Sequence, residues 1–229
     1  LALMADITAR RKIPLLVGGT MLYYKALLEG LAELPQACPA TRADIDAMAA
    51  EHGWPFVHTQ LAVIDPTTAS RLHPTDAQRI QRALEVCRLS GRPMSALLAG
   101  GETQKPPYRF LSLGLLPADR AVLHHRIAER FDTMLAAGLE DEVSALRQRY
   151  RLSLALPSMR CVGYRQVWEV QDGLTPRHEM RDRGIYATRQ LAKRQTTWMN
   201  NTLKPEIFDC LAADLLPHLL RHVEAAVKA

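Results

Sequence analysis

A short turn of two glycines and a threonine, Gly18-Gly19-Thr20, follows an apolar run and precedes a segment with helical spacing. In open α/β sheets such a turn lies at the carboxyl end of a strand, where backbone N–H groups of the next helix point into the ligand crevice. The alternative is a tight turn in which Thr20 only caps the helix. The sequence Gly-x-x-x-x-Gly-Lys-[Ser/Thr] occurs nowhere in the chain, so the turn is not a Walker-type loop.

Arg126 and Arg130 lie one helical turn apart and form a second candidate site. Two guanidinium groups at this spacing could clamp a diphosphate. The alternative is that they pair on the surface with the neighbouring Glu129 and Asp132. His73 has no second ligand or nucleophile near it in sequence, so we expect it to be structural.

Positive charge is concentrated in three stretches, and each could also be a solvated helix face. Residues 176–201 hold six Lys and Arg against two acidic residues, and residues 78–82 place Gln and Arg side chains on one helix face. Residues 143–168 contain no Asp or Glu, so the positive charges of their arginines repel one another unless an anion lies nearby. The arginines of this last stretch are Arg147, Arg149, Arg151, Arg160 and Arg165.

The side chains in these stretches suit single-stranded RNA. Gln and Arg can bond base edges as well as phosphates. Two of the stretches also carry an aromatic neighbour, Tyr164 or Trp198, that could stack on an unpaired base. The net charge of +5 fits a polyanionic partner but is common in proteins that have none.

Cysteine spacing and hydropathy narrow the class of protein. The four cysteines, at positions 38, 87, 161 and 210, form no Cys-x-x-Cys pair, so neither a disulfide framework nor a zinc site is predicted. The longest apolar run, residues 13–24, is interrupted by the glycines and too short to cross a bilayer. We expect free thiols, a cytoplasmic protein and no membrane partner.

Hydrophobic periodicity predicts the elements that position these residues. Residues 13–17 and 110–116 have strand character, and a Gly- and Pro-containing loop is expected at 100–107. A capping box is expected at Thr41-x-x-Asp44, and Pro117 is expected in the first turn of a helix. Helices are predicted over residues 21–30, 41–50, 55–64, 76–90, 118–137, 140–150, 164–172, 176–201 and 214–227.

The order of these elements predicts an α/β chain with a helical lobe inserted between two strands. A buried parallel strand needs several neighbours, yet only two strands are evident. Leu1, Met4, Ile7 and Arg11 already follow helical spacing with no capping residue before them. We therefore expect the remaining strands to lie before Leu1.

Four motifs in order resemble the bacterial tRNA dimethylallyltransferases, also called tRNA isopentenyltransferases of the IPP transferase family. The resemblance extends from about residue 1 to residue 198, and four separate motifs make it more specific than any charge argument. The motifs are Leu16-Val-Gly-Gly-Thr-Met-Leu-Tyr-Tyr24, His73-Pro-Thr-Asp-Ala-Gln-Arg-Ile-Gln-Arg-Ala-Leu-Glu85, Arg160-Cys-Val-Gly-Tyr-Arg165 and Ala187-Thr-Arg-Gln-Leu-Ala-Lys-Arg-Gln-Thr-Thr-Trp198.

This resemblance implies an activity and a fold. The activity is transfer of a dimethylallyl group from dimethylallyl diphosphate to N6 of the adenosine 3′-adjacent to the anticodon of tRNA, with Mg²⁺ as cofactor and a monomeric enzyme bound to the anticodon stem-loop. The fold is a P-loop NTPase-like parallel-sheet core, incomplete at the N-terminus, with an inserted all-helical domain and a helical C-terminal region. The implied domains are residues 1–33 with 110–229, and 34–109 for the insertion.

The resemblance also implies the roles of individual residues. Thr20 resembles the threonine that contacts the target adenine and is a catalytic candidate with Arg130, and Arg130 with Gly18 and Gly19 would meet the diphosphate. The implied tRNA contacts are Thr20, Arg42, Gln78, Arg79, Ile80, Gln81, Arg82, Arg160, Cys161, Val162, Gly163, Tyr164, Arg165, Lys193, Arg194, Gln195, Thr196, Thr197, Trp198, Met199 and Asn200.

The chain departs from the family pattern at two points. The Walker-type loop and the aspartate proposed as general base would lie before the position of Leu1, so we expect the chain alone to be inactive. Asn200 stands where many members have arginine, which removes one phosphate contact. A non-catalytic RNA-binding module and a P-loop kinase of a small molecule are the alternative functions.

Overall fold

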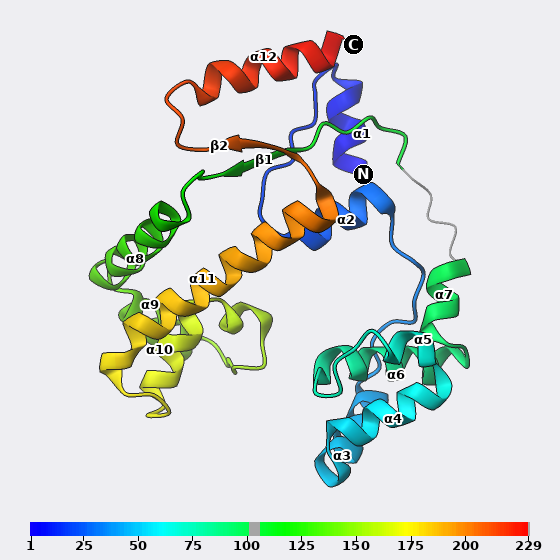
Figure 1. Ribbon diagram of the computed structural model, residues 1–229. Coiled ribbons are helices and arrows are strands. Elements are labelled where there is room, and N and C mark those ends of the chain that lie inside the picture. The colour runs from blue at the N-terminus through cyan, green and yellow to red at the C-terminus, as the bar shows by residue number, and fades with distance from the viewer. Residues whose placement is uncertain (101–105, 229) are drawn as a thin grey trace. The chain divides into compact units, whose positions relative to one another are not determined.

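Figure 1 shows the computed structural model of the chain, which describes residues 1–100 and 106–228. The chain forms two compact units. We call Ala26–Pro107 the inserted unit, and Leu1–Lys25 with Tyr108–Ala229 the flanking unit. Most of the expected loop at 100–107 lies outside the described residues.

Helices make up the inserted unit. Its described helices are α3 (Pro39–His52), α4 (Trp54–Ile64), α5 (Pro66–Ala69), α6 (Ala77–Ser90) and α7 (Met94–Gly100), and it also includes the end of α2 (Met21–Glu29).

Helix α6 has clear start and stop signals. The Asp76 carboxylate accepts a hydrogen bond from the backbone N–H of Arg79 (3.3 Å) and caps the N-terminus. Gly91 ends the helix with φ of +67°, a left-handed conformation that glycine adopts without strain. The apolar face of α6 supplies Ile80 and Leu84 to a buried core that Ile45, Val57 and Leu61 complete from α3 and α4.

A buried carboxylate joins three helices of the inserted unit. Asp65, at the end of α4, accepts hydrogen bonds from the backbone N–H groups of Thr68 (3.0 Å) and Ser95 (2.8 Å). Both hydroxyl groups also donate to it, each at 2.7 Å. Burial raises the pKa of Asp65, but the hydrogen bonds from Ser95 and Thr68 outweigh it and lower the pKa to about 2. α4, α5 and α7 are therefore fixed by one negative charge.

The flanking unit holds the described strands and the remaining helices. Its helices are α1 (Ala2–Ala9), the start of α2, α8 (Arg120–Ala136), α9 (Leu139–Arg149), α10 (Tyr164–Gln171), α11 (Met180–Trp198) and α12 (Leu215–Lys228), with short 3-10 turns at Pro157–Arg160 and Arg177–Glu179 and a π-helical turn at Met199–Leu203.

Two apolar clusters hold these helices together. In the first, Phe131 and Ile127 of α8 pack on Ile185 of α11. Gly184 makes this approach possible, because an added Cβ would lie 2.0 Å from the Phe131 ring. In the second, residues of α9, α10 and the start of α11 pack together, namely Leu139, Val143, Val167 and Met180.

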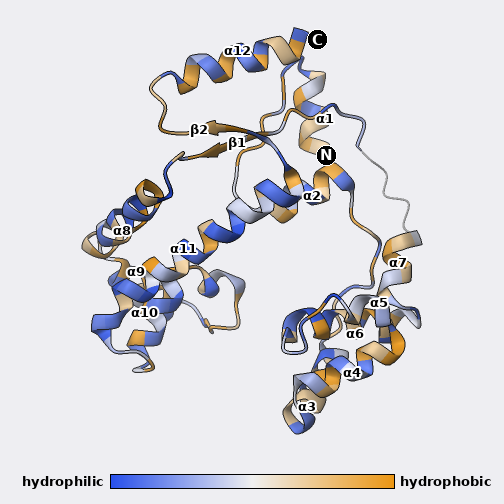
Figure 2. Cartoon of the chain, in the orientation of Figure 1, coloured by the Kyte–Doolittle hydropathy of each residue, from blue (hydrophilic) through white to orange (hydrophobic). Residues whose placement is uncertain are grey.

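A two-stranded parallel sheet links distant parts of the flanking unit. β1 (Leu113–Leu116) pairs with β2 (Glu206–Asp209) in a register that places Leu113 opposite Glu206 and Leu116 opposite Asp209. The Ile207 side chain packs over Gly114, since a Cβ at Gly114 would lie 2.6 Å from Ile207 Cδ1. In α12, which follows β2, hydrophobic and hydrophilic residues alternate (Figure 2), and Leu216 and Leu220 are exposed.

The strand expected at 13–17 is wrong for the described chain. These residues have no strand pairing, and Ile13, Leu15 and Val17 are 65%, 85% and 85% exposed. The physical reason is that a strand exists only through hydrogen bonds to a neighbour, and no described segment supplies one. β2 was not expected, because Pro205 and the flanking acidic residues interrupt its short apolar pattern.

Two helix starts and one long helix also need correction. α3 begins at Pro39 with Cys38 as its N-cap, so Thr41 lies inside the helix and forms no capping box. Pro117 lies before α8, whose N-terminus is capped by Asp119 through the backbone N–H of Ala121 (2.7 Å). The helix expected over 176–201 is continuous only as α11, between a 3-10 turn and a π-helical turn.

Other predictions from the sequence are confirmed. α2, α4, α6, α9, α10 and α12 lie within one or two residues of the expected ranges, and the chain does open on a helix, α1. The chain is α/β, mostly helical with a small parallel sheet. Among the described residues no helix is both long and apolar enough to cross a membrane.

We predict that Asp65→Asn destabilises the inserted unit by about 2–3 kcal/mol at pH 7, because an amide NH₂ group would face backbone N–H donors. The pKa of Asp65 is lower in the folded chain than its ordinary value of 3.8. The carboxylate therefore stabilises the fold above about pH 4, and this contribution disappears as the pH falls toward 2.

Urea unfolding at pH 7 and at pH 3 measures both effects. Asp44→Asn, at an exposed position of α3, is the matched control and should change the free energy of unfolding little. Equal effects of the two substitutions at pH 7 would contradict the role of Asp65.

Candidate functional site

The glycine turn is held against helix α11. Gln195 Nε2 donates a hydrogen bond to the carbonyl oxygen of Gly19 (2.8 Å), across 176 residues of sequence. The Tyr24 hydroxyl donates to the carbonyls of Leu16 (3.4 Å) and Gly18 (3.3 Å). The turn is therefore held by hydrogen bonds from a side chain of α11 and from a side chain of α2.

Thr20 lies at the exposed end of this turn. Its carbonyl accepts a hydrogen bond from the backbone N–H of Tyr23 (3.0 Å), which starts α2, while its hydroxyl has no hydrogen bond within the described chain. The threonine side chain is therefore available to a ligand. Capping of the helix by this hydroxyl, the alternative interpretation, is not observed.

Gly19 lies directly against the amide end of the Gln195 side chain. A Cβ at this position would lie 2.5 Å from Gln195 Nε2. A methyl group would displace the amide and break its bond to the Gly19 carbonyl. The sequence predicts Gln195 as a tRNA contact. In the structure Gln195 also holds the glycine turn, a role that depends on a tertiary contact and could not be predicted from the sequence.

The end of α11 combines buried and exposed candidates. Lys193 and Arg194 are exposed and form no ion pair with the described residues. Met199, in contrast, is buried, so its side chain packs into the fold. The hydroxyls of Thr196 and Thr197 donate to the carbonyls of Ala192 (3.0 Å) and Lys193 (2.9 Å) within the helix. Trp198 is partly buried and Asn200 is exposed.

The Arg160–Arg165 segment forms the start of α10. Gly163 has φ of +100°, and its N–H donates to the buried Gln166 side chain (2.8 Å). The Tyr164 hydroxyl donates to Glu142 of α9, which raises the pKa of Tyr164. Arg165 pairs with Glu169 (2.7 Å), while Arg160 donates to the Leu154 carbonyl (3.3 Å). Arg160 and Arg165, at the two ends of this segment, are exposed, as is Cys161.

On α8, Arg126 and Arg130 are both exposed and have no ion pair among the described residues. The expected alternative, pairing with Glu129 and Asp132, is wrong. Glu129 lies 3.1 Å from His125 Nε2, and Asp132 binds Arg181 of α11 through two bonds of 2.6 and 2.8 Å. The Arg181 guanidinium lowers the pKa of Asp132. Two uncompensated positive charges therefore remain on α8.

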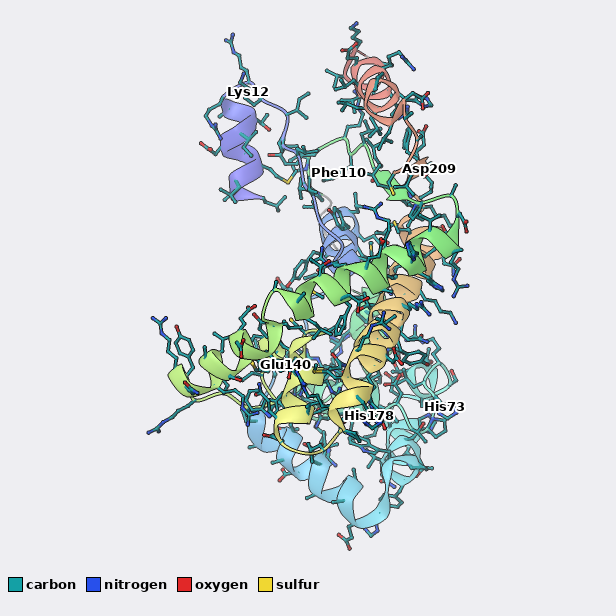
Figure 3. All side chains as sticks on the ribbon, turned by 90° about the vertical axis from the view of Figure 1, so that its left-hand side faces the viewer. Lys12, His73, Phe110, Glu140, His178 and Asp209 are labelled. Carbon is teal, nitrogen blue, oxygen red and sulfur yellow. The ribbon has the colours of Figure 1, made fainter. Side chains whose placement is uncertain are left out.

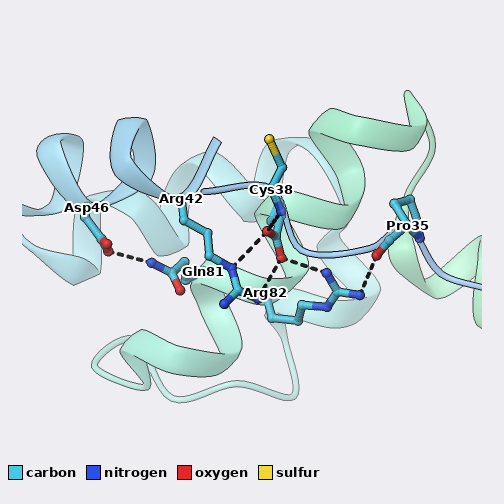
Figure 4. A network of polar contacts seen from close by, with 7 residues as sticks. Pro35, Cys38, Arg42, Asp46, Gln81 and Arg82 are labelled. Atoms are coloured by element: carbon cyan, nitrogen blue, oxygen red, sulfur yellow. Dashed lines mark hydrogen bonds and ion pairs between the residues drawn. The ribbon is translucent and has the colours of Figure 1, made fainter. Parts of the chain in front are cut away.

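Candidate residues of the inserted unit meet at one buried carboxylate, Glu85, for which no role was expected. Arg42 donates to it through Nε (2.9 Å) and Nη2 (3.1 Å), and Arg82 through Nη1 (2.7 Å). The backbone N–H of Cys38 also donates (2.8 Å), and Arg82 reaches the Pro35 carbonyl (2.8 Å), as Figure 4 shows. Burial raises the pKa of Glu85, but the bonds from Arg42 and Arg82 outweigh it and lower the pKa to about 2.

This network presents two arginines in fixed positions. The Arg42 and Arg82 side chains remain 40% and 33% exposed, and two cations on one carboxylate leave a net positive charge. The network could thus hold guanidinium edges toward a phosphate. Its only sequence signal is an acidic residue three positions after Arg82, inside an apolar helix face.

The other residues of the 78–82 segment differ in their burial and in their hydrogen-bond partners. Ile80 is fully buried in the core and contributes only packing. Gln81 donates to Asp46 (2.6 Å), Arg79 pairs with Asp76 (2.9 Å), and Gln78 is exposed. His73, labelled in Figure 3, shares a 2.8 Å hydrogen bond with Thr75 in the turn before α6, as a structural residue would.

A metal site needs several ligating side chains close together. No group of three or more His, Cys, Asp or Glu side chains within residues 1–100 and 106–228 could hold a metal ion.

Comparisons with known proteins agree on one family. A sequence model of the IPP transferase family matches residues 1–202. The tRNA dimethylallyltransferase of Dechloromonas aromatica (strain RCB) is 64% identical over 225 residues, covering 98% of this chain and 72% of that protein. The tRNA dimethylallyltransferase of Burkholderia vietnamiensis is 58% identical over 227 residues, covering 98% and 70%.

Solved structures of similar proteins support the same fold. The full-length tRNA isopentenylpyrophosphate transferase of Bacillus halodurans superposes with a TM-score of 0.62 at 30% identity, covering 98% of this chain and 70% of that one. The corresponding transferase of Staphylococcus epidermidis gives a TM-score of 0.58 at 26% identity, with 99% and 73% covered.

We predict that Gly19→Ala lowers the free energy of unfolding by about 1 kcal/mol, because the methyl group displaces the Gln195 amide and its hydrogen bond to the Gly19 carbonyl is lost. Gln195→Ala removes only the hydrogen bond and should cost about 1 kcal/mol. In the double variant the methyl group has no amide to displace, so its stability should equal that of Gln195→Ala. Urea unfolding of the four proteins measures this coupling. A Gly19→Ala cost that is undiminished in the Gln195→Ala background would show that the two residues do not touch.

Proposed function

This chain belongs to the IPP transferase family, and we propose that it transfers a dimethylallyl group from dimethylallyl diphosphate to N6 of the adenosine 3′-adjacent to the anticodon of tRNA. The observation that carries the proposal is the bond between Gln195 and the Gly19 carbonyl. This bond joins a turn with an available threonine hydroxyl to a helix with unpaired cations, in a chain 64% identical to a tRNA dimethylallyltransferase.

The reaction replaces a C–O bond with a C–N bond and transfers one proton to a base. The N6 atom of adenosine bonds to C1 of the dimethylallyl group while the C1–O bond to the diphosphate breaks, and diphosphate leaves with the electron pair. The proton on N6 passes to a base, which we do not assign to any described residue. The adenine must leave its base stack to react, so the enzyme needs contacts that hold it outside the stack.

We assign the adenine contact to Thr20, whose exposed hydroxyl can donate to or accept from the base edge. Gly18 and Gly19 let the backbone approach the diphosphate closely, since neither has a side chain. Arg130, with Arg126 one turn before it, would neutralise the charge that develops on the leaving diphosphate. Their lack of carboxylate partners among the described residues supports this role.

Contacts to tRNA are assigned to both units. In the flanking unit, Lys193 and Arg194 would bind phosphates, together with Arg160 and Arg165 at the start of α10. In the inserted unit, Arg42 and Arg82 on Glu85 would present fixed guanidinium edges, and Gln78 an exposed amide. We also propose that the inserted domain spans residues 34–109 and that the core is P-loop NTPase-like.

Mg²⁺ is the cofactor that we propose for the reaction. When bound it would neutralise the diphosphate. None of the steps above depends on a metal ligand within the described residues. The relatives are named as transferases, so neither a non-catalytic RNA-binding module nor a small-molecule kinase is favoured.

We predict that Thr20→Ala lowers kcat/KM for tRNA prenylation by roughly 100-fold, because a misplaced adenine reacts slowly. The tRNA Kd should change less than twofold, since phosphate contacts supply most of the affinity. The assay uses the product of the complete coding sequence with dimethylallyl diphosphate, Mg²⁺ and unmodified tRNA. Thr133→Ala, an exposed threonine on α8, is the matched control and should behave as wild type.

Absence of N6-dimethylallyladenosine with the wild-type protein would refute the proposed function. Wild-type activity in Thr20→Ala would refute the role of the turn. The double variant Lys193→Gln/Arg194→Gln should show the opposite pattern, with weaker tRNA binding and a log Kd–log salt slope reduced by about 1.4, or about 0.7 for each phosphate of a single strand that the variant no longer neutralises.

A further inference from the structure

The end of α9 forms a hollow that no role above uses. It is open, has a volume of about 630 Å³, and is lined mainly by Arg147, Arg149, Tyr150, Arg151 and Trp168. We name it the arginine hollow. We propose that it binds the phosphate backbone of tRNA, as a surface additional to the contacts assigned above. The inference rests on the proposed function and extends it.

One wall of the arginine hollow is rigid. The Arg147 guanidinium lies 4.1 Å from the centre of the Trp168 ring, a cation–π contact. Asp172 holds both residues, accepting from Arg147 Nη2 (2.5 Å) and from Trp168 Nε1 (2.7 Å). Arg147 Nη1 also donates to Gln171 (3.0 Å). The bond from Arg147 lowers the pKa of Asp172, so this carboxylate stays ionised, and the Arg147 guanidinium balances its charge.

The two other arginines have no partner of this kind. Arg149 and Arg151 are exposed and form neither an ion pair nor a hydrogen bond with any residue in the described part of the chain. None of the lining residues in that part is Asp or Glu. The hollow thus carries about two uncompensated positive charges, and these repel each other unless an anion lies between them.

An exposed aromatic residue lies between the two arginines in sequence. Tyr150 is 50% exposed, and the Arg149 guanidinium lies 5.3 Å from the centre of its ring. The Tyr150 backbone is extended (φ −127°, ψ 150°), so α9 ends here, and Tyr150 and Arg151 both line the hollow. Cations beside an exposed aromatic ring are typical of surfaces that bind single-stranded nucleic acid, where phosphates meet the charges and a base stacks on the ring.

Several other arginines of the flanking unit are paired with carboxylates, unlike Arg149 and Arg151. Arg177 pairs with Glu140 (2.9 Å), Arg183 with Glu179 (2.8 Å), and Arg181 with Asp132 (2.6 Å). An acidic peptide could also meet two free arginines, but it would not use the exposed ring. The combination favours RNA.

The test compares two double variants with the same change in charge. Arg149→Gln/Arg151→Gln removes the free arginines, and Arg177→Gln/Arg183→Gln removes two paired ones. The tRNA Kd is measured from about 50 to 200 mM salt for the complete protein. We expect the first variant to bind about tenfold more weakly, with a log Kd–log salt slope reduced by about 1.4, and the control to stay near wild type. All positions are exposed, so both variants should keep the wild-type Tm within a few degrees.

A second variant tests the ring. Tyr150→Ala should weaken tRNA binding several-fold without changing the salt slope, because stacking releases no counterion. Equal tRNA affinities and equal slopes for the two double variants would overturn the inference. Poly-glutamate serves as the probe for an acidic peptide. If Arg149→Gln/Arg151→Gln weakened the binding of poly-glutamate but not of tRNA, the inference would also be overturned. Wild-type protein that binds tRNA with these properties but forms no prenylated product would refute the proposed function and leave the arginine hollow supported.

Discussion

The flanking unit depends on the absence of a side chain at Gly184. The Phe131 ring fills the space where a Cβ would stand, and this lets α8 and α11 approach closely along Ile127 and Ile185. α8 carries Arg130, and α11 carries Lys193, Arg194 and Gln195 on its later turns. A larger residue at 184 would separate the two helices, and interiors packed to native density have no room to absorb such a shift locally. The relative positions of the cations assigned to diphosphate and to tRNA therefore depend on this contact, together with the Asp132–Arg181 ion pair between the same two helices.

Charge in this chain is divided between two uses. Arginines such as Arg181, bound to Asp132, join helices, and their charge is neutralised within the fold. Others, including Arg126, Arg130 and Arg149, are exposed and have no carboxylate partner among the described residues. The Glu85 network combines both uses, because one carboxylate fixes two guanidinium groups and leaves one charge in excess. Composition reports only the sum of these charges, and it is their pairing in space that indicates where an anion binds.

Local signals explain how much of this structure the sequence predicts. α6 was predicted well because its cap, its apolar face and its terminal glycine all lie within sixteen residues. The strand expected at 13–17 failed because strand formation depends on a partner elsewhere in the chain. The partners of Glu85 were missed for a related reason, since Cys38 and Arg42 lie 47 and 43 residues away. Motif resemblance suggested roles for Thr20, Arg130 and the basic segments, but neither the bond that fixes the turn nor the absence of partners for Arg149 and Arg151 could be predicted from it.

The bond between Gln195 and Gly19 also constrains the order in which the protein is made and folded. The ribosome releases the glycine turn early, but the side chain that holds it is synthesised 176 residues later. Closing so long a loop is entropically costly, so the bond forms only after α11 has folded and packed. The turn around Thr20 therefore acquires this contact only after the C-terminal part of the chain has been synthesised.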